Sequence, residues 1–167
     1  MTIATCKQDQ FTAFVSRALL PLAGLLGLST AGAVFSAPCS GYDVIVPISA
    51  STMEVAKDHK MTVLRSHGIV ITEDPKSRYN QMFGECAGTL ITLPDGKSTG
   101  QGHCARKDPE GNSYSLEWAI AAGAEKGTWK FVSGTGKFAG VAGSGWWMFG
   151  KSVEDGSAIN RWGGECN

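Results

Sequence analysis

Side chains that could bind a metal ion or attack a substrate are few in this sequence. Its three histidines, His59, His67 and His103, are never two, three or four residues apart, whereas a metal site needs ligands spaced to meet at one ion. Gly96-Lys97-Ser98-Thr99-Gly100 has the spacing of a nucleophile elbow, but no helical pattern follows it, so we expect no strand-to-helix turn that would expose a catalytic serine. We therefore expect no metal site, no cofactor and no nucleophilic serine.

Acid–base chemistry would have to come from carboxylates in segments with strand character. The candidates are Glu85, Glu117 and Glu165, with His67 and Arg106 as partners. Side chains alternate between the two faces of a strand, so Glu117 is expected to face water if its neighbour Trp118 faces the interior. A carboxylate held in an apolar interior would have a raised pKa and could serve as a base. The sequence assigns none of the three glutamates to that position, and we expect no catalytic residue.

The segment 127–145 is rich in glycine, but it fits neither of the common phosphate-binding patterns. A P-loop continues Gly-Lys with Ser or Thr, and here Gly136-Lys137 is followed by Phe138. A dinucleotide-binding turn needs its third glycine where Ala139 stands. We interpret these glycines as structural residues at turns and barrel corners. They are Gly134, Gly136, Gly140, Gly143 and Gly145.

The same segment resembles a known superfamily. Gly134-Thr-Gly-Lys-Phe138, followed by Gly140-Val-Ala-Gly143-Ser-Gly145 and preceded by a Gly-x-Trp strand, is similar to the allene oxide cyclase barrel-like superfamily, and more narrowly to its exported bacterial members. The dirigent proteins of plants are distantly similar in shape. The resemblance is firm over 127–145 and loose over 79–163. It implies an eight-stranded antiparallel barrel with a central cavity, and it carries over no catalytic residue, because the shared motif is a turn.

The elements around these residues read independently as short strands separated by turns. Strand signals occur at 42–48, 61–72, 113–120, at Trp129 and Phe131, at 146–149 and at 160–163. Turn residues stand between them, and only 51–60 could form a helix. Seven or eight such strands favour a closed antiparallel up-and-down β-barrel, with a β-sandwich as the alternative.

The N-terminus has the features of a secretory signal peptide. Lys7 and Arg17 precede an apolar stretch that ends in small residues, with Ala31-Gly32-Ala33 as a favoured cleavage site. We predict a signal peptide over 1–37 and a β-barrel domain over 38–167. The protein would then be periplasmic or secreted and would keep no stable membrane anchor.

The charge of the predicted domain excludes one class of partner. The whole chain holds 15 basic and 15 acidic residues, and 1–37 contains two basic residues and one acidic. The domain therefore carries 13 basic and 14 acidic residues, and this near balance leaves no basic field that would attract nucleic acid.

Four cysteines remain after Cys6 is removed with the signal, and an even number in an exported domain predicts two disulfides. The turn Leu93-Pro94-Asp95-Gly96-Lys97 places Leu93 opposite Lys97, and stepping outward along the hairpin places Cys86 opposite Cys104. Cys39 would then pair with Cys166. The rival is Cys86 with Cys166, since Gly-Glu-Cys occurs at both positions.

The interior of a small barrel is filled by side chains or holds one small ligand. Strand parity groups five aromatic residues as candidate lining. They are Tyr114, Trp118, Trp129, Phe131 and Trp146. The favoured function is binding of a small hydrophobic molecule without chemistry, against the alternative of a plainly packed core.

Two other functions stay open. The first is a cyclase or isomerase acting on a lipid-like or polyketide-like substrate, which requires a buried Glu, His, Arg or Tyr that points into a cavity. The second is a structural or interaction module, with a homo-oligomer as one form. For that module, Trp147, Phe149 and Trp162 are expected on the outer face, opposite to the candidate lining.

Overall fold

A computed structural model of the chain describes residues 36–153 and 155–167. The predicted signal peptide lies almost wholly outside the described residues. Within them, helical structure is limited to one 3-10 turn, η1 (Gly136–Phe138), which is far shorter than a membrane span.

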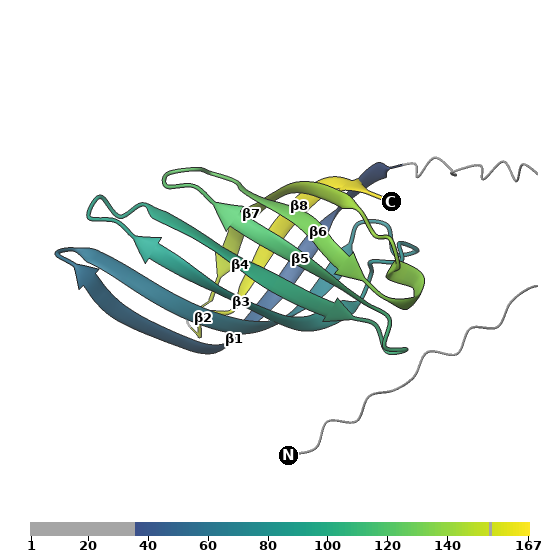
Figure 1. The fold of residues 1–167 in the computed structure, drawn as a ribbon, viewed down its shortest axis with the longest axis horizontal. Helices are drawn as coiled ribbons and strands as arrows, with labels where there is room; N and C mark the ends of the chain where they lie inside the picture. The colour runs from purple at the N-terminus through teal and green to yellow at the C-terminus, as the bar shows by residue number, and fades with distance from the viewer. Residues whose placement is uncertain (1–35, 154) are drawn as a thin grey trace, which may run out of the picture. The chain divides into compact units, whose positions relative to one another are not determined.

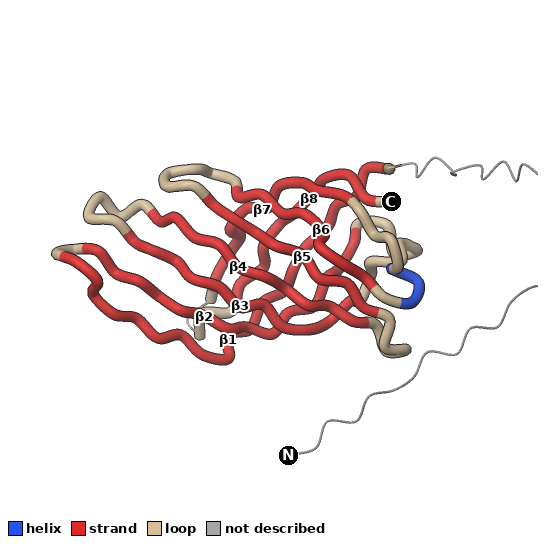
Figure 2. The backbone as a smooth tube through the Cα atoms, in the orientation of Figure 1, coloured by secondary structure: helices blue, strands red, loops and turns tan. Residues whose placement is uncertain are grey.

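Eight antiparallel strands form a closed barrel in which each strand pairs with its neighbours in the sequence and the last pairs with the first (Figure 1). The prediction of an up-and-down eight-stranded barrel is confirmed, and the sandwich alternative is wrong. The strands are β1 (Ala37–Ala56), β2 (His59–Thr72), β3 (Met82–Thr92), β4 (Ser98–Lys107), β5 (Ser113–Ile120), β6 (Gly127–Gly134), β7 (Gly143–Ser152) and β8 (Ala158–Cys166). The segment 51–60, which could have been helical, is the end of β1, a turn and the start of β2 (Figure 2).

The β3–β4 hairpin follows the register that its turn dictates. Leu93 N–H donates to Lys97 O at 2.8 Å, and Gly96 takes a φ of 80°, a conformation that favours glycine. Residues whose numbers sum to 190 therefore face each other along the hairpin, and Cys86 lies opposite Cys104. The predicted disulfide between these two residues is confirmed.

The barrel closes between its first and last strands. Ala37 pairs with Cys166, and Tyr42 pairs with Arg161 further along the ladder. The Cys39–Cys166 disulfide joins the two strands, so the second predicted pairing is confirmed and the rival Cys86–Cys166 is wrong. β1 begins at Ala37, one residue before the predicted domain boundary.

One end of the barrel is plugged by apolar side chains from its connections and from the start of β3. Phe138 of η1 and Met82 at the start of β3 are fully buried, and Tyr79 of the β2–β3 connection is nearly so. The Tyr79 ring stacks on Phe131 at 5.4 Å between centroids, and its hydroxyl donates to Asn167 O at 2.7 Å. Burial of each such side chain contributes roughly 1.5–3 kcal/mol, so this end is the packed core of the barrel.

The glycine-rich segment forms the β6–β7 connection beside this plug. Gly136 and Gly140 have φ values of 57° and 74°, in the left-handed region. A side chain at Gly136 would also collide with Asn112. The segment thus turns the chain tightly from β6 through η1 to β7.

The two disulfides should differ in their effect on stability. Cys39–Cys166 spans 127 residues and Cys86–Cys104 spans 18. Loop-closure entropy then predicts losses of roughly 5 and roughly 3 kcal/mol in the free energy of unfolding when each pair is replaced by serine. Urea denaturation of the two double variants checks this order, and an equal or larger loss for the Cys86/Cys104 variant would contradict it.

Candidate functional site

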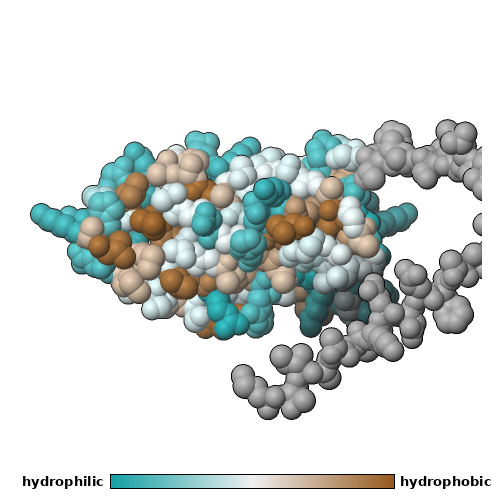
Figure 3. Space-filling model, in the orientation of Figure 1, coloured by the Kyte–Doolittle hydropathy of each residue, from teal (hydrophilic) through white to brown (hydrophobic). Residues whose placement is uncertain are grey.

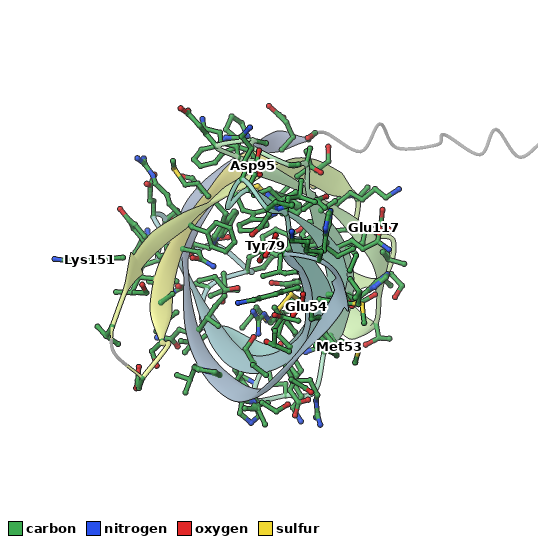
Figure 4. All side chains as sticks on the ribbon, turned by 90° about the vertical axis from the view of Figure 1, so that its left-hand side faces the viewer. Met53, Glu54, Tyr79, Asp95, Glu117 and Lys151 are labelled. Atoms are coloured by element: carbon green, nitrogen blue, oxygen red, sulfur yellow. A yellow bond between two sulfur atoms is a disulfide. The ribbon has the colours of Figure 1, made fainter. Side chains whose placement is uncertain are left out.

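The lumen of the barrel contains a cavity of about 300 Å³, referred to below as the lumen cavity. Inward-facing residues of all eight strands line it, and its surface is chiefly apolar. Tyr79 lies across the plugged end, and in Figure 4, which looks in from the opposite end, Tyr79 lies inside the ring of strands. At that opposite end the lining includes exposed residues such as Ala50 and Phe149, so the lumen cavity reaches solvent there.

Strand alternation sends four of the five predicted lining residues into the lumen cavity. Tyr114, Trp118, Trp129 and Phe131 all line it. Trp118 pairs across β5 and β6 with Trp129, and its ring lies over Gly88 and Gly102, where a side chain would collide with it.

The fifth, Trp146, does not line the cavity, and its prediction is wrong. Trp129 pairs with Gly145, and Gly127 pairs with Trp147, so the residues that share the lumen face of β7 are the odd-numbered ones. Trp146 lies on the outer face, where the Lys126 Nζ is 4.3 Å from its ring centroid.

The predicted outer aromatic patch is wrong for the same reason. Trp147, Phe149 and Trp162 line the lumen cavity. Trp147 packs edge-on against Phe149 at 4.8 Å, and Trp162 packs edge-on against Trp129 at 6.0 Å. The cavity therefore has more aromatic surface than the sequence predicted, and edge-to-face pairs hold its rings in place.

The outer face carries a different set of exposed apolar residues. On the face shown in Figure 3, hydrophobic residues are interrupted by polar ones. Around the closure of the barrel, register places exposed apolar side chains on β8, β1, β2 and β3 next to one another. They are Tyr42, Val46, Ile69, Ile71, Phe83 and Ile159.

A buried ion pair lies in the wall of the lumen. Arg106, on β4, is 2% exposed, and its Nη2 is 2.7 Å from Asp43 Oδ2 on β1. Nη1 donates to Gly84 O at 2.7 Å and to Gly68 O at 3.2 Å, and Nη2 also lies 3.2 Å from Cys86 Sγ. Paired and hydrogen-bonded in this way, the guanidinium meets the conditions under which a buried charge is tolerated.

Two glycines make this pair possible. The ladders place Arg106 opposite Gly84, Gly84 opposite Gly68, and Gly68 opposite Ile45, all on the lumen side. A side chain at Gly68 would collide with the guanidinium. Because β2 and β3 carry no side chain at these positions, Arg106 can cross both strands and reach Asp43 on β1.

Asp43 is the carboxyl group of the lumen. Burial raises its pKa above the ordinary 3.8, while the charge and hydrogen bond of Arg106 act in the opposite direction and only partly offset it. Its Oδ1 is buried and has no hydrogen-bond partner. Trp162 Nε1 on β8 is likewise buried without a partner, and the Tyr114 hydroxyl has a pKa raised by burial.

The glutamates considered at first are all on the outside. Glu85 pairs with Arg65 at 2.6 Å, Glu117 pairs with Lys130 at 3.0 Å, and Glu165 accepts from Ser36 at 3.0 Å. His67 and His103 share these outer faces, because they lie opposite Glu85 and Glu117 in the ladders. In the described part of the chain, no three His, Cys, Asp or Glu side chains come together as metal ligands.

From the sequence, Arg106 is expected only as a partner of a glutamate, and Asp43 is not among the candidate residues. The available signal was an acidic residue inside the apolar run Tyr42–Ile48, together with glycines at positions 68 and 84. The lumen can therefore offer an apolar wall, a hydrogen-bond acceptor and a carboxyl group able to hold a proton near a fixed positive charge.

Breaking the Asp43–Arg106 pair on one side should be more harmful than removing it whole. Asp43→Ala leaves the guanidinium buried without its counter-charge, and we expect a loss of about 3–5 kcal/mol in the free energy of unfolding. The double variant Asp43→Leu/Arg106→Met should lose less. Chemical denaturation measures both variants, and a loss in the double variant equal to or larger than that of Asp43→Ala would contradict the pairing.

The raised pKa of Asp43 also predicts a pH dependence of stability. The folded protein holds the Asp43 proton more tightly than the unfolded chain, so this contribution is complete below pH 3.8 and is lost as pH rises through the raised pKa. The free energy of unfolding of the native protein, relative to Asp43→Asn, should therefore fall as the pH rises above 3.8. Urea denaturation at each pH measures it, and a relative stability that rises with pH would refute the raised pKa.

Comparison with known proteins found matches among solved structures alone. No family model matches the sequence, and no curated protein matches it. Fourteen chains of solved structures match. The pterocarpan synthase dirigent protein GePTS1 is 16% identical, with 86% of this chain and 98% of that chain covered and a TM-score of 0.48. The pterocarpan synthase dirigent protein PsPTS1 is 14% identical (80% and 95% covered, TM-score 0.47), and pyocyanin demethylase is 12% identical (77% and 99% covered, TM-score 0.47). Membership of the allene oxide cyclase barrel-like superfamily stays a prediction.

Proposed function

We propose that this protein binds a small hydrophobic molecule in its lumen cavity, with the apolar part of the ligand against the tryptophans and one polar group at Asp43. The observation that carries the proposal is a solvent-connected, largely aromatic cavity of about 300 Å³ with a partly unsatisfied carboxyl in its wall. Eight-stranded barrels have room for one small ligand, and binding pockets begin at about this volume.

The size of the cavity limits the ligand. An apolar cavity of about 150 Å³ accommodates benzene, so about 300 Å³ corresponds to a molecule of roughly two rings. The edge-to-face pairs Trp118–Trp147 and Trp129–Trp162 present flat apolar surfaces to such a molecule. Planar aromatic ligands should therefore bind better than branched aliphatic ones of the same volume.

The polar atoms of the wall define the functional group of the ligand. Asp43 Oδ1 lacks a donor and Trp162 Nε1 lacks an acceptor, and the two residues lie on the lumen sides of neighbouring strands, two positions apart in register. Rotation of the carboxyl about its last torsion, which is broad for Asp, turns an oxygen toward the cavity. A ligand hydroxyl can donate to that oxygen and accept from an N–H, so it would satisfy groups that are costly to leave unpaired.

Compartment is part of the proposal. The protein acts in the periplasm or outside the cell, and the two disulfides support this, because disulfides persist in oxidising compartments.

Binding can be tested with 2-naphthol and its methyl ether, 2-methoxynaphthalene, which has the same rings but no donor hydrogen. We expect 2-naphthol to quench tryptophan fluorescence at saturable concentrations and to bind about 10- to 100-fold more tightly than the ether, because a hydrogen bond to a charged group contributes about 1.5–3 kcal/mol. Isothermal titration calorimetry gives both dissociation constants.

Two variants locate the binding. Leu116→Trp fills the lumen cavity and should abolish binding in the calorimeter, whereas Thr128→Trp, on the outer face of the neighbouring strand β6, should leave the dissociation constant unchanged. Equal affinity for naphthol and its ether in the native protein would remove Asp43 from the proposal, and no binding of either would remove the proposal itself.

A second candidate function, catalysis of an isomerisation or cyclisation, is favoured by one observation. A carboxyl group with a raised pKa lies next to a buried guanidinium in an apolar lumen, which is the buried ionisable group that such chemistry requires. Asp43 would transfer the proton while Arg106 stabilises the developing negative charge. Recovery of a bound native ligand unchanged after long incubation favours binding alone, whereas a rearranged product that disappears in Asp43→Asn favours catalysis.

A further inference from the structure

We propose that the Cys86–Cys104 disulfide is a thiol–disulfide exchange site for small apolar thiols that enter the lumen cavity. The proposal uses the access to the lumen that the proposed function requires, but it does not depend on the hydroxyl recognition by Asp43. It assigns a chemical activity to a bond that is not needed to hold the hairpin together, since ten residue pairs already join β3 and β4.

The first observation is the position of the bond. Cys86 and Cys104 both line the lumen cavity, because the register of the hairpin sends even-numbered residues of both strands inward. Of the other disulfide only Cys166 lines it. The Cys86–Cys104 bond is therefore presented to any molecule that the cavity admits, and it is shielded from solutes outside the barrel.

The second observation is the positive charge at one of the two sulfurs. Arg106 Nη2 lies 3.2 Å from Cys86 Sγ, and the guanidinium is almost fully buried. A nearby cation favours the thiolate form of a cysteine, and disulfide exchange is faster when the sulfur that leaves is stabilised as a thiolate. Attack should therefore occur at Cys104, with Cys86 leaving.

The third observation is the apolar approach to Cys104. Its direct neighbour across β4 and β5 is Leu116, which pairs in turn with Phe131, and both line the lumen cavity. A charged thiol would lose its hydration along this path, whereas an apolar thiol would gain from burial. The substrate class is thus a neutral thiol small enough for about 300 Å³.

The reaction balances without an external oxidant. A substrate thiol enters in its neutral form and releases its proton to solvent as its sulfur attacks Cys104 Sγ; a new sulfur–sulfur bond forms, and Cys86 Sγ departs as a thiolate beside Arg106. A second substrate thiolate attacks the substrate sulfur of this mixed disulfide, which releases the substrate disulfide and the Cys104 thiolate. Two thiols are oxidised, the protein disulfide is reduced to two thiols that take up the two protons released, and a small apolar disulfide reverses every step.

The test compares two thiols on the folded, full-length protein: benzyl mercaptan, which is apolar, and 2-mercaptoethanesulfonate, which is charged. After acid quenching, mass spectrometry of peptides locates every adduct. We expect a mixed disulfide on Cys104, an intact Cys39–Cys166 bond, and a rate at least about tenfold higher with benzyl mercaptan. Equal rates for the two thiols, an adduct on Cys86, or a Cys86–Cys104 bond that does not react in the folded protein would each overturn the proposal.

A variant and a competitor isolate the causes. Arg106→Met should slow exchange at least about tenfold if it folds, as circular dichroism checks, and an unchanged rate in the folded variant would remove the role of the cation. In the native protein, 2-naphthol should slow the reaction by occupying the lumen. Binding of 2-naphthol without exchange overturns this inference and leaves the proposed function standing. Exchange without binding of 2-naphthol overturns the proposed function and leaves this inference standing.

Discussion

The lumen of this barrel depends on one electrostatic constraint: a guanidinium placed inside an eight-stranded wall must be fully paired there. Arg106 meets that constraint by crossing two strands at Gly84 and Gly68 to reach Asp43 on β1. The same contact holds the Asp43 carboxyl group in the wall of the lumen and places a positive charge beside Cys86. The apolar walls make these charges effective, because electrostatic interactions are stronger where water is excluded.

Closure of the barrel turns this local arrangement into a site. With the last strand paired to the first, each inward residue has neighbours on both sides, and one end is plugged by Tyr79, Phe138 and Met82. At the other end, beside the long β1–β2 hairpin, exposed residues belong to the lining, so the aromatic side chains border a cavity that reaches solvent there. The aromatic pairs pack against the inner wall of the barrel but leave the cavity between them empty. A ligand in that cavity can supply the missing van der Waals contacts.

Part of this structure could be predicted from the sequence. A register predicted across a turn of defined geometry was confirmed, and one predicted across an irregular connection was wrong. The Leu93–Lys97 turn defines a register, so the Cys86–Cys104 bond followed by counting. The β6–β7 connection defines no such register, because η1 and several left-handed glycines separate Trp129 from Trp146. The alternation of inward and outward residues in β6 could therefore not be continued into β7, and Trp146 was assigned to the wrong face. The pair Asp43–Arg106 could not be predicted, since its contact depends on the registers of three successive strand pairs, from β1 to β4.

The central claim, that the lumen holds a small aromatic molecule with its hydroxyl at Asp43, is tested most directly by crystallography with 6-bromo-2-naphthol. The account predicts one anomalous bromine peak inside the barrel, with the naphthol oxygen within hydrogen-bonding distance, about 2.5–3.0 Å, of an Asp43 carboxyl oxygen. A lumen without bromine, or a ligand bound only on the outer face of the barrel, would contradict it.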